Sequence, residues 1–202
     1  AAAVYAQGYL RSESRAAHRD PEESLLFDNA PEAVFTGCLL MFLGTMTLVE
    51  LGRHLGLTWV AVEATTLTSA FLVNFFDRAA AIEAAWKYMI INTVALLLGL
   101  FGVFLFIGAV EQAELSFALD WASIALAAPL LDVMLVKIAF VFMVIGYGTK
   151  AGLAPLHNWL PDAHSQAPSP VSALLSGALL NIALLALLRF KAIVDVTAGP
   201  GF

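Results

Sequence analysis

The stretch from Tyr88 to Val110 reads YMIINTVALLLGLFGVFLFIGAV and contains no charged side chain. A helix needs about 20 mainly apolar residues to cross the hydrocarbon core of a bilayer, and this stretch is long enough. The rest of the chain agrees, because 60% of its 202 residues are hydrophobic and only 13% are charged. A soluble domain carries about 25% charged residues. The sequence therefore predicts an all-α integral membrane protein embedded in a lipid bilayer.

Five stretches have the length and apolar character of membrane-spanning segments. They lie at residues 33–51, 55–76, 86–110, 130–165 and 171–188. The fourth is too long for one straight crossing, and Pro155 within it removes a backbone hydrogen-bond donor. We therefore expect a broken helix, interrupted near residues 151–155, with Pro155 opening its second half. The alternative is that residues 155–164, which are rich in Trp, His and Asp, form a loop outside the membrane.

The ends of the chain are less apolar. We expect residues 1–32 to hold the end of a preceding helix and a polar loop, residues 33–191 the membrane domain, and residues 192–202 a tail. Both ends look cut, so we expect a piece of a longer subunit. Arginines in the N-terminal loop, Arg15 and Arg19 among them, place that loop in the cytoplasm by the positive-inside rule.

Several classes of function are not expected from the composition. The ten Lys and Arg residues form no basic run, so no nucleic-acid partner is expected. Cys38 is the only cysteine, which excludes an intrachain disulfide and a cysteine metal cluster. The sequence shows no phosphate-binding glycine loop, nucleophile triad or haem motif. We therefore expect no cofactor and no catalytic site within this chain itself.

Two charged residues lie inside apolar segments, Lys150 just before Pro155 and Glu63 near the middle of the second segment. A charge near the bilayer centre costs at least about 2.5 kcal/mol, and such residues are usually functional. A Glu63–Lys150 pair would stabilise both charged forms, and opening it would let the lysine release its proton. We expect a proton switch. The alternative is a static ion pair that locks two helices together.

Four other titratable residues are candidate members of a proton path. Lys137 lies about 20 Å before the buried lysine along a helix, which suits either a second station or a side chain that reaches the interface. Lys87, at the start of the third segment, is either a relay or an interfacial anchor. His157 and His164 would share one helix face and exchange protons at a wet mouth, or serve as capping or loop residues. With Asp162 they supply too few ligands for a metal site.

The run from Pro155 to Pro168, PLHNWLPDAHSQAP, resembles a signature of the antiporter-like membrane subunits of respiratory complex I. The same family includes Mrp-type sodium/proton antiporters and membrane-bound nickel–iron hydrogenases. The continuation from Ser169 to Asn181, SPVSALLSGALLN, most resembles component F of the hydrogenase-4 and formate hydrogenlyase group. The resemblance implies proton or sodium translocation in a redox-driven complex. It also implies other membrane subunits as partners and the inner (cytoplasmic) membrane of a prokaryote.

Such subunits contain two inverted repeats of five helices, and this chain would be the first repeat. The resemblance gives Lys150 the place of the key lysine on a discontinuous helix, Glu63 that of its modulating glutamate, and Lys87 that of a recurring lysine. Complex I relatives carry a lysine or histidine in the last helix of the repeat. Here Ser176 and Asn181 stand there, and neither titrates.

Two rival functions follow from these residues. One is an ion-coupled transporter subunit of the Mrp type or for inorganic-carbon uptake. The other is a structural anchor that docks a soluble enzyme without moving ions. The non-titrating residues of the last segment favour the anchor, whereas Glu63 and Lys150 favour transport more strongly because intramembrane charges are expensive.

Overall fold

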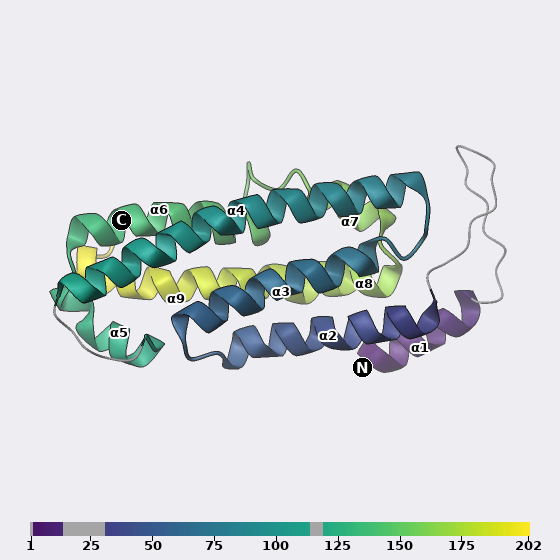
Figure 1. Ribbon diagram of the computed structural model, residues 1–202, viewed down its shortest axis with the longest axis horizontal. Coiled ribbons are helices and arrows are strands. Elements are labelled where there is room, and N and C mark those ends of the chain that lie inside the picture. Colours follow the sequence, from purple (N-terminus) through teal and green to yellow (C-terminus); the bar gives the residue numbers. More distant parts are fainter. Residues whose placement is uncertain (1, 14–30, 114–118) are drawn as a thin grey trace.

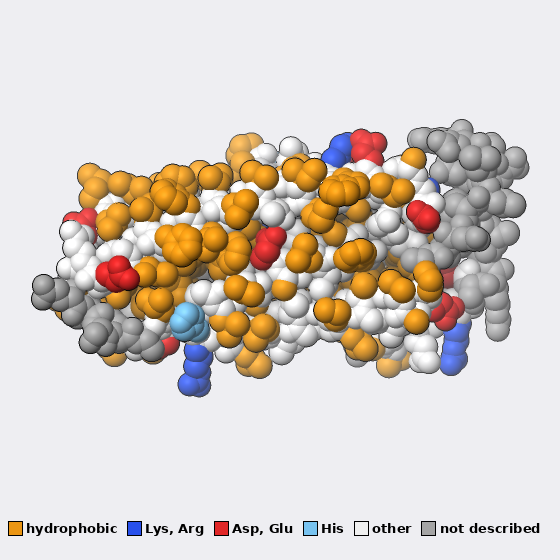
Figure 2. Space-filling view, viewed as in Figure 1, with side chains coloured by type: hydrophobic (Ala, Val, Ile, Leu, Met, Phe, Trp, Pro, Cys, Tyr) orange, Lys and Arg blue, Asp and Glu red, His pale blue; other side chains and the backbone are white. Residues whose placement is uncertain are grey.

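The computed structural model describes residues 2–13, 31–113 and 119–202. Within them, long helices run side by side along the long axis of the molecule (Figure 1). Five helical stretches are long and apolar enough to cross a membrane: α2 (Glu32–Leu51), α3 (Leu55–Val73), α4 (Ala79–Gln112), α6 (Val133–Lys150) and Ser169–Ala198. Hydrophobic side chains cover most of one face, and charged side chains gather mainly toward the two ends (Figure 2). The predicted all-α membrane fold with five spanning segments is confirmed.

Shorter elements lie at the ends of the bundle. The N-terminal helix α1 (Ala2–Glu13) lies beside α2, and α5 (Trp121–Ala127) lies at the opposite end of the bundle (Figure 1). A 3-10 turn, η1 (Ala128–Leu130), joins α5 to α6. The last spanning stretch comprises α8 (Ser169–Leu174), a π-helical turn η2 (Leu175–Leu179) and α9 (Leu180–Ala198). Most of the predicted N-terminal polar loop, residues 14–30, lies outside the described residues.

Helix α4 packs against both α3 and α6, and α6 packs against α9. The backbones of α4 and α6 approach each other closely at Gly146. A Cβ atom there would lie 2.7 Å from the Cα atom of Gly99 and 2.8 Å from the carbonyl oxygen of Ala95. Small residues let helix backbones approach closely in lipid, where dispersion contacts replace the hydrophobic effect as the driving force. This contact fixes the position of α6 along α4. It therefore also fixes the position of Lys150, which lies at the end of α6.

Two helices extend beyond the bounds expected from apolar runs. Helix α4 begins at Ala79, not at residue 86, because alanines and the 2.7 Å ion pair between Glu83 and Lys87 favour helix there. Helix α9 continues through Ala198, so residues 192–198 of the expected tail are helical. An ion pair with the same spacing, Lys191 to Asp195, supports that extension. Charged side chains end an apolar run without ending a helix.

The fourth segment is broken, as predicted. Helix α6 ends at Lys150, turns follow over residues 151–159, and the second helical piece is α7 (Leu160–Gln166). Gly152 adopts a φ of 72° at the break, a conformation that glycine enters without steric cost. The prediction that Pro155 opens the second half is wrong. Pro161 occupies the first turn of α7 instead, where a missing backbone N–H breaks no helical hydrogen bond.

Candidate functional site

Lys150 is the last residue of α6, and none of its surface is exposed. Its Nζ atom donates hydrogen bonds to the hydroxyl of Tyr88 (2.6 Å) and to Oγ1 of Thr66 (2.9 Å). The same atom lies 4.7 Å from the centre of the Tyr88 ring. The amine is therefore held by uncharged hydroxyls from α3 and α4.

A second pair of hydrogen bonds extends this cluster along α3. The Tyr88 hydroxyl lies 2.6 Å from Oγ of Ser69, and Ser69 in turn donates to the carbonyl oxygen of Thr65 at 2.5 Å. Thr66, Ser69 and Tyr88 are buried, and we call them, with Lys150, the hydroxyl cluster. Sequence reasoning missed the three hydroxyl residues. The available signal was the spacing of Thr65, Thr66 and Ser69, which lie on one side of an otherwise apolar helix.

Glu63 lies on α3 and is half-buried. Its Oε1 atom accepts a hydrogen bond of 2.8 Å from Oγ1 of Thr93 on α4, whereas its enclosed Oε2 atom has no hydrogen-bond partner among the described residues. No direct ion pair joins Glu63 to Lys150 within the described part of the chain, because Thr93 and the hydroxyl cluster hold the two groups separately. The two charges interact only through space. A functional coupling between them stays a prediction.

Lys87 precedes Tyr88 in the sequence, but its side chain binds carboxylates and not the hydroxyl cluster. Its Nζ atom lies 2.7 Å from Oε1 of Glu83 and 3.1 Å from Oδ2 of Asp162, so it links α4 to α7. The Lys87 side chain is 49% exposed. These three residues and Gln166 contribute to the lining of a polar cavity of about 180 Å³. The structure places Lys87 in a polar opening and not in the hydroxyl cluster.

The other predicted relay residues lie apart from the cluster. The Nζ atom of Lys137 lies 4.7 Å from the centre of the Phe202 ring. His164 on α7 shares a 2.7 Å hydrogen bond with Ser172. His157 is exposed in the turns before α7. The expectation that both histidines share a helix face is therefore wrong, because α7 begins only after His157. No three His, Cys, Asp or Glu side chains form a possible metal site in the described ranges.

The polar residues of the last segment satisfy themselves locally. Ser176 donates a long hydrogen bond, 3.4 Å, to the carbonyl of Ala173, and Asn181 donates at 2.8 Å to the carbonyl of Gly177. Both side chains bond to their own helix, and both residues are exposed. They contribute no contact to the hydroxyl cluster in the described structure.

Trp159 fixes the connection that follows Lys150. None of its surface is exposed, and its Nε1 atom donates a 2.9 Å hydrogen bond to the carbonyl oxygen of Thr149. Its ring centre lies 4.9 Å from that of Tyr88. One buried indole thus satisfies a carbonyl near the end of α6 and packs on the tyrosine that binds the amine.

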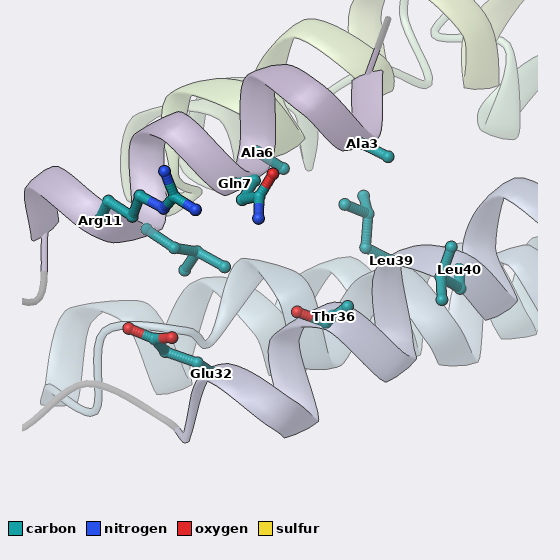
Figure 3. A pocket seen from close by; sticks show the side chains of 9 residues that line it. Ala3, Ala6, Gln7, Arg11, Glu32, Thr36, Leu39 and Leu40 are labelled. Atoms are coloured by element: carbon teal, nitrogen blue, oxygen red, sulfur yellow. The ribbon is translucent and has the colours of Figure 1, made fainter.

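A separate pocket of about 360 Å³ lies between α1 and α2. Figure 3 shows Arg11 and Gln7 on α1 across from Glu32 and Thr36 on α2. No member of the hydroxyl cluster lines this pocket. The pocket is therefore a feature of the α1–α2 contact and does not open onto Lys150.

The chain matches known membrane proteins over most of its length. The family model described as "NADH:quinone oxidoreductase/Mrp antiporter, TM" matches residues 52–200. A hydrogenase-4 component F homolog from Methylacidiphilum infernorum (isolate V4) is 39% identical, with 98% of this chain and 41% of the relative covered. NADH-quinone oxidoreductase subunit N from Desulforudis audaxviator (strain MP104C) is 35% identical, with 99% and 36% covered. This chain thus spans well under half the length of these relatives.

Solved structures show the same fold. A chain of respiratory complex I from Thermus thermophilus with bound aureothin has a TM-score of 0.63 at 33% identity, covering 77% of this chain and 33% of that chain. A chain of the archaeal membrane-bound sulfane sulfur reductase has a TM-score of 0.74 at 24% identity, covering 82% and 33%, which supports the fold alone. The broken fourth segment, the buried lysine at its break and these matches lead to one conclusion: this chain belongs to the NADH:quinone oxidoreductase/Mrp antiporter membrane family.

Proposed function

We propose that this chain is an ion-conducting part of a proton-translocating, antiporter-like membrane subunit, with Lys150 as its proton carrier. The observation that carries the proposal is a fully buried amine at a helix break, hydrogen-bonded to two uncharged hydroxyls. Burial disfavours the charged amine, and no carboxylate of the described residues contacts it directly, which leaves its neutral form accessible. A hydroxyl serves either form, because it both donates and accepts hydrogen bonds. Such an amine is suited to gaining and losing a proton.

Glu63 is the proposed modulator of this carrier. Its carboxylate interacts with Lys150 electrostatically and favours the protonated amine, and it is tied to α4 through Thr93. A shift of α3 against α4 would change the separation of acid and amine, and with it the tendency of Lys150 to hold its proton. Glu63 and Lys150 would then be coupled electrostatically over a distance, without the direct ion pair expected from the sequence. Thr66 on α3 and Tyr88 on α4 bind the same amine, so such a shift also reaches the carrier directly.

The remaining candidates connect the carrier to water in this proposal. Lys87 and Asp162 line the polar opening beside α7, while His157 and His164 lie on either side of the start of α7. We assign them to proton exchange at that side of the bundle. Lys137, earlier on α6, is assigned to the opposite direction of the path.

The names of the relatives support a place for this chain in a larger membrane complex. Two carry the names hydrogenase-4 component F homolog and NADH-quinone oxidoreductase subunit N, and both are longer than this chain. We infer that the chain works with other membrane subunits of a redox-driven complex in the cytoplasmic membrane of a prokaryote. Protons are the proposed ion because the central group is an amine. Sodium is the alternative, which a sodium-uptake arm of the experiment tests.

The experiment is Lys150→Met in the complete complex, reconstituted into vesicles. Redox-driven acidification is followed with a pH-sensitive dye, sodium uptake with radioactive sodium, and assembly by native gel. The variant is expected to assemble and to lose proton translocation. Lys150→Arg is expected to lose it too, because a guanidinium keeps its proton. Lys191→Met removes a cation outside the cluster and serves as the control.

An assembled Lys150→Met complex that still translocates protons at the wild-type rate would overturn the proposal. That result would favour the structural anchor. The anchor already has one observation on its side, since Ser176 and Asn181 do not titrate and bond to their own helix. If the wild-type complex takes up sodium but moves no protons, and Lys150→Met abolishes the sodium uptake, sodium is the transported ion.

A further inference from the structure

Tyr88 on α4 and Ser69 on α3 form a chain of hydrogen bonds that begins at the buried amine of Lys150. The Tyr88 hydroxyl lies between two partners at equal distances, 2.6 Å from Nζ of Lys150 and 2.6 Å from Oγ of Ser69. Ser69 has its own acceptor in the carbonyl oxygen of Thr65 at 2.5 Å. Tyr88 and Ser69 are fully buried, so water does not compete for these bonds.

We propose that Tyr88 and Ser69 form a reversible hydrogen-bond pair that holds Lys150 in both of its protonation states. With an ammonium, Tyr88 accepts from Nζ and donates to Ser69, which donates to the carbonyl of Thr65. With a neutral amine, the Tyr88 hydroxyl rotates and donates to the Nζ lone pair, and Ser69 donates to Tyr88. The proposal rests on Lys150 being the proton carrier.

The pair itself moves no net proton. Each hydroxyl keeps its own hydrogen atom and only changes the direction of its bond. The transferred proton leaves through the third N–H of the ammonium, which neither Tyr88 nor Thr66 binds. Rotation about the Cε–Nζ bond then turns the new lone pair toward Tyr88, and the reverse rotation frees it before a proton returns. Tyr88 and Ser69 are therefore positioning residues. They keep the amine in one place while its charge changes.

Removal of the pair should have a directional effect. A hydrogen bond from an ammonium is about twice as strong as one between neutral groups. Losing the Tyr88 hydroxyl therefore weakens the charged form of Lys150 more than the neutral form. The rate of translocation should fall at alkaline pH, where Lys150 loses its proton. We call this part of the pH profile the alkaline limb, and it should move to lower pH.

Other titratable groups belong to the elements packed around Lys150. They are Glu63 on α3, Glu83, Lys87 and Glu111 on α4, Lys137 and Tyr147 on α6, His157 before α7, Asp162 and His164 on α7, and Arg189, Lys191 and Asp195 on α9. Glu63 acts on Lys150 through space, whereas Lys87 and Asp162 bind each other. The test therefore compares variants that leave all the charged residues unchanged.

The test measures proton translocation by the complete reconstituted complex across a range of pH for three variants. Tyr88→Phe is expected to move the alkaline limb down by about one pH unit, the shift of a lost charge-assisted hydrogen bond. Ser69→Ala should move it in the same direction by less, because Tyr88 then lacks an acceptor. Tyr147→Phe is the matched control. Tyr147 is equally buried, but its hydroxyl has no hydrogen-bond partner in the described structure.

The variants separate the role of the Tyr88–Ser69 pair from the role of Lys150 as proton carrier. If Lys150→Met leaves translocation intact, the proposed function falls and the pair loses its role with it. If Lys150→Met abolishes translocation but Tyr88→Phe and Ser69→Ala keep the wild-type limb, the pair alone is overturned. A lower yield of Tyr88→Phe complex with an unmoved limb means a packing role only and also overturns it. Should Tyr88→Phe not assemble, Ser69→Ala alone decides.

Discussion

Glu63 accepts its 2.8 Å hydrogen bond from Thr93 on α4, the helix that also carries Tyr88, one of the two hydroxyl residues that bind Lys150. The acid and the amine are therefore each tied to α4, by Thr93 and by Tyr88. Any relative movement of α3 and α4 is felt by both groups. A substitution at Thr93 therefore tests whether the position of Glu63 matters.

Thr93→Val should weaken this connection without changing the size of the side chain. The variant removes the one donor to Glu63 and leaves both carboxylate oxygens without a hydrogen bond from the described residues. We expect the free energy of unfolding in detergent to fall by about 1.5 kcal/mol, the value of a hydrogen bond to a charged group. Proton translocation should slow as well. Thr93→Ser keeps the hydroxyl and should behave as wild type; equal effects of Val and Ser would contradict the assignment.

Gly146→Ala should separate α4 from α6. The new Cβ atom would meet backbone atoms of Gly99 and Ala95 at 2.7–2.8 Å, and backbone cannot move aside as a flexible side chain does. We expect a loss of about 1–3 kcal/mol in unfolding free energy, typical of overpacking. Translocation should fall too, since Lys150 lies one turn further on. Gly108→Ala is the control, because nothing lies within 4 Å of that position. Equal stability of the two variants would refute the close contact.

The sequence predicted the spanning helices well because each contains a long, mainly apolar run, the clearest being that between Tyr88 and Val110. It also identified Lys150 and Glu63, since a charge within such a run stands out without any structure. It did not reveal what the two charges touch. Partner choice depends on how helices are rotated against one another, and the small hydrophobic asymmetry of these helices gives no such information. Tyr88 illustrates this, because it follows Lys87 in sequence yet faces the opposite, buried environment.

The break in the fourth segment shows a similar limit. Its presence followed from length and from Pro155, but the point where helix resumes did not. Pro155 and Pro161 could each begin the second helical piece, and only Pro161 lies in the first turn of α7. The histidine face expected from a seven-residue spacing failed for the same reason, because His157 precedes the helix.

Trp159→Phe should loosen the end of α6. The indole donates at 2.9 Å to the carbonyl of Thr149, which also accepts at 3.1 Å from the backbone N–H of Gly152, so phenylalanine would remove one of its two hydrogen bonds. The loss of one hydrogen bond costs about 1 kcal/mol of unfolding free energy, which comparison of unfolding in detergent can measure. Trp86→Phe is the matched control, since Trp86 is 56% exposed on α4. If both variants have the same free energy of unfolding as the wild type, the indole hydrogen bond contributes nothing to stability.

Arg189 should be irreplaceable by lysine where α9 meets the end of α2. Its guanidinium donates to the carbonyl oxygens of Val49 and Gly52 at 3.2 Å and of Glu50 at 2.7 Å. The group also lies 5.8 Å from the Trp121 ring centre. These carbonyls belong to the last turn of a helix, where the backbone lacks its own donors, and a fork of N–H groups satisfies several at once.

A lysine has one compact ammonium and cannot span three carbonyls. We therefore expect Arg189→Lys to lose most of the stability that Arg189→Met loses, about 2 kcal/mol from hydrogen bonds to a charged donor. Unfolding by a graded detergent titration gives the measurement, and Arg53→Met, at an exposed residue just after the same helix, is the control. A lysine variant as stable as wild type would show that charge, and not the fork of donors, holds α9 to α2.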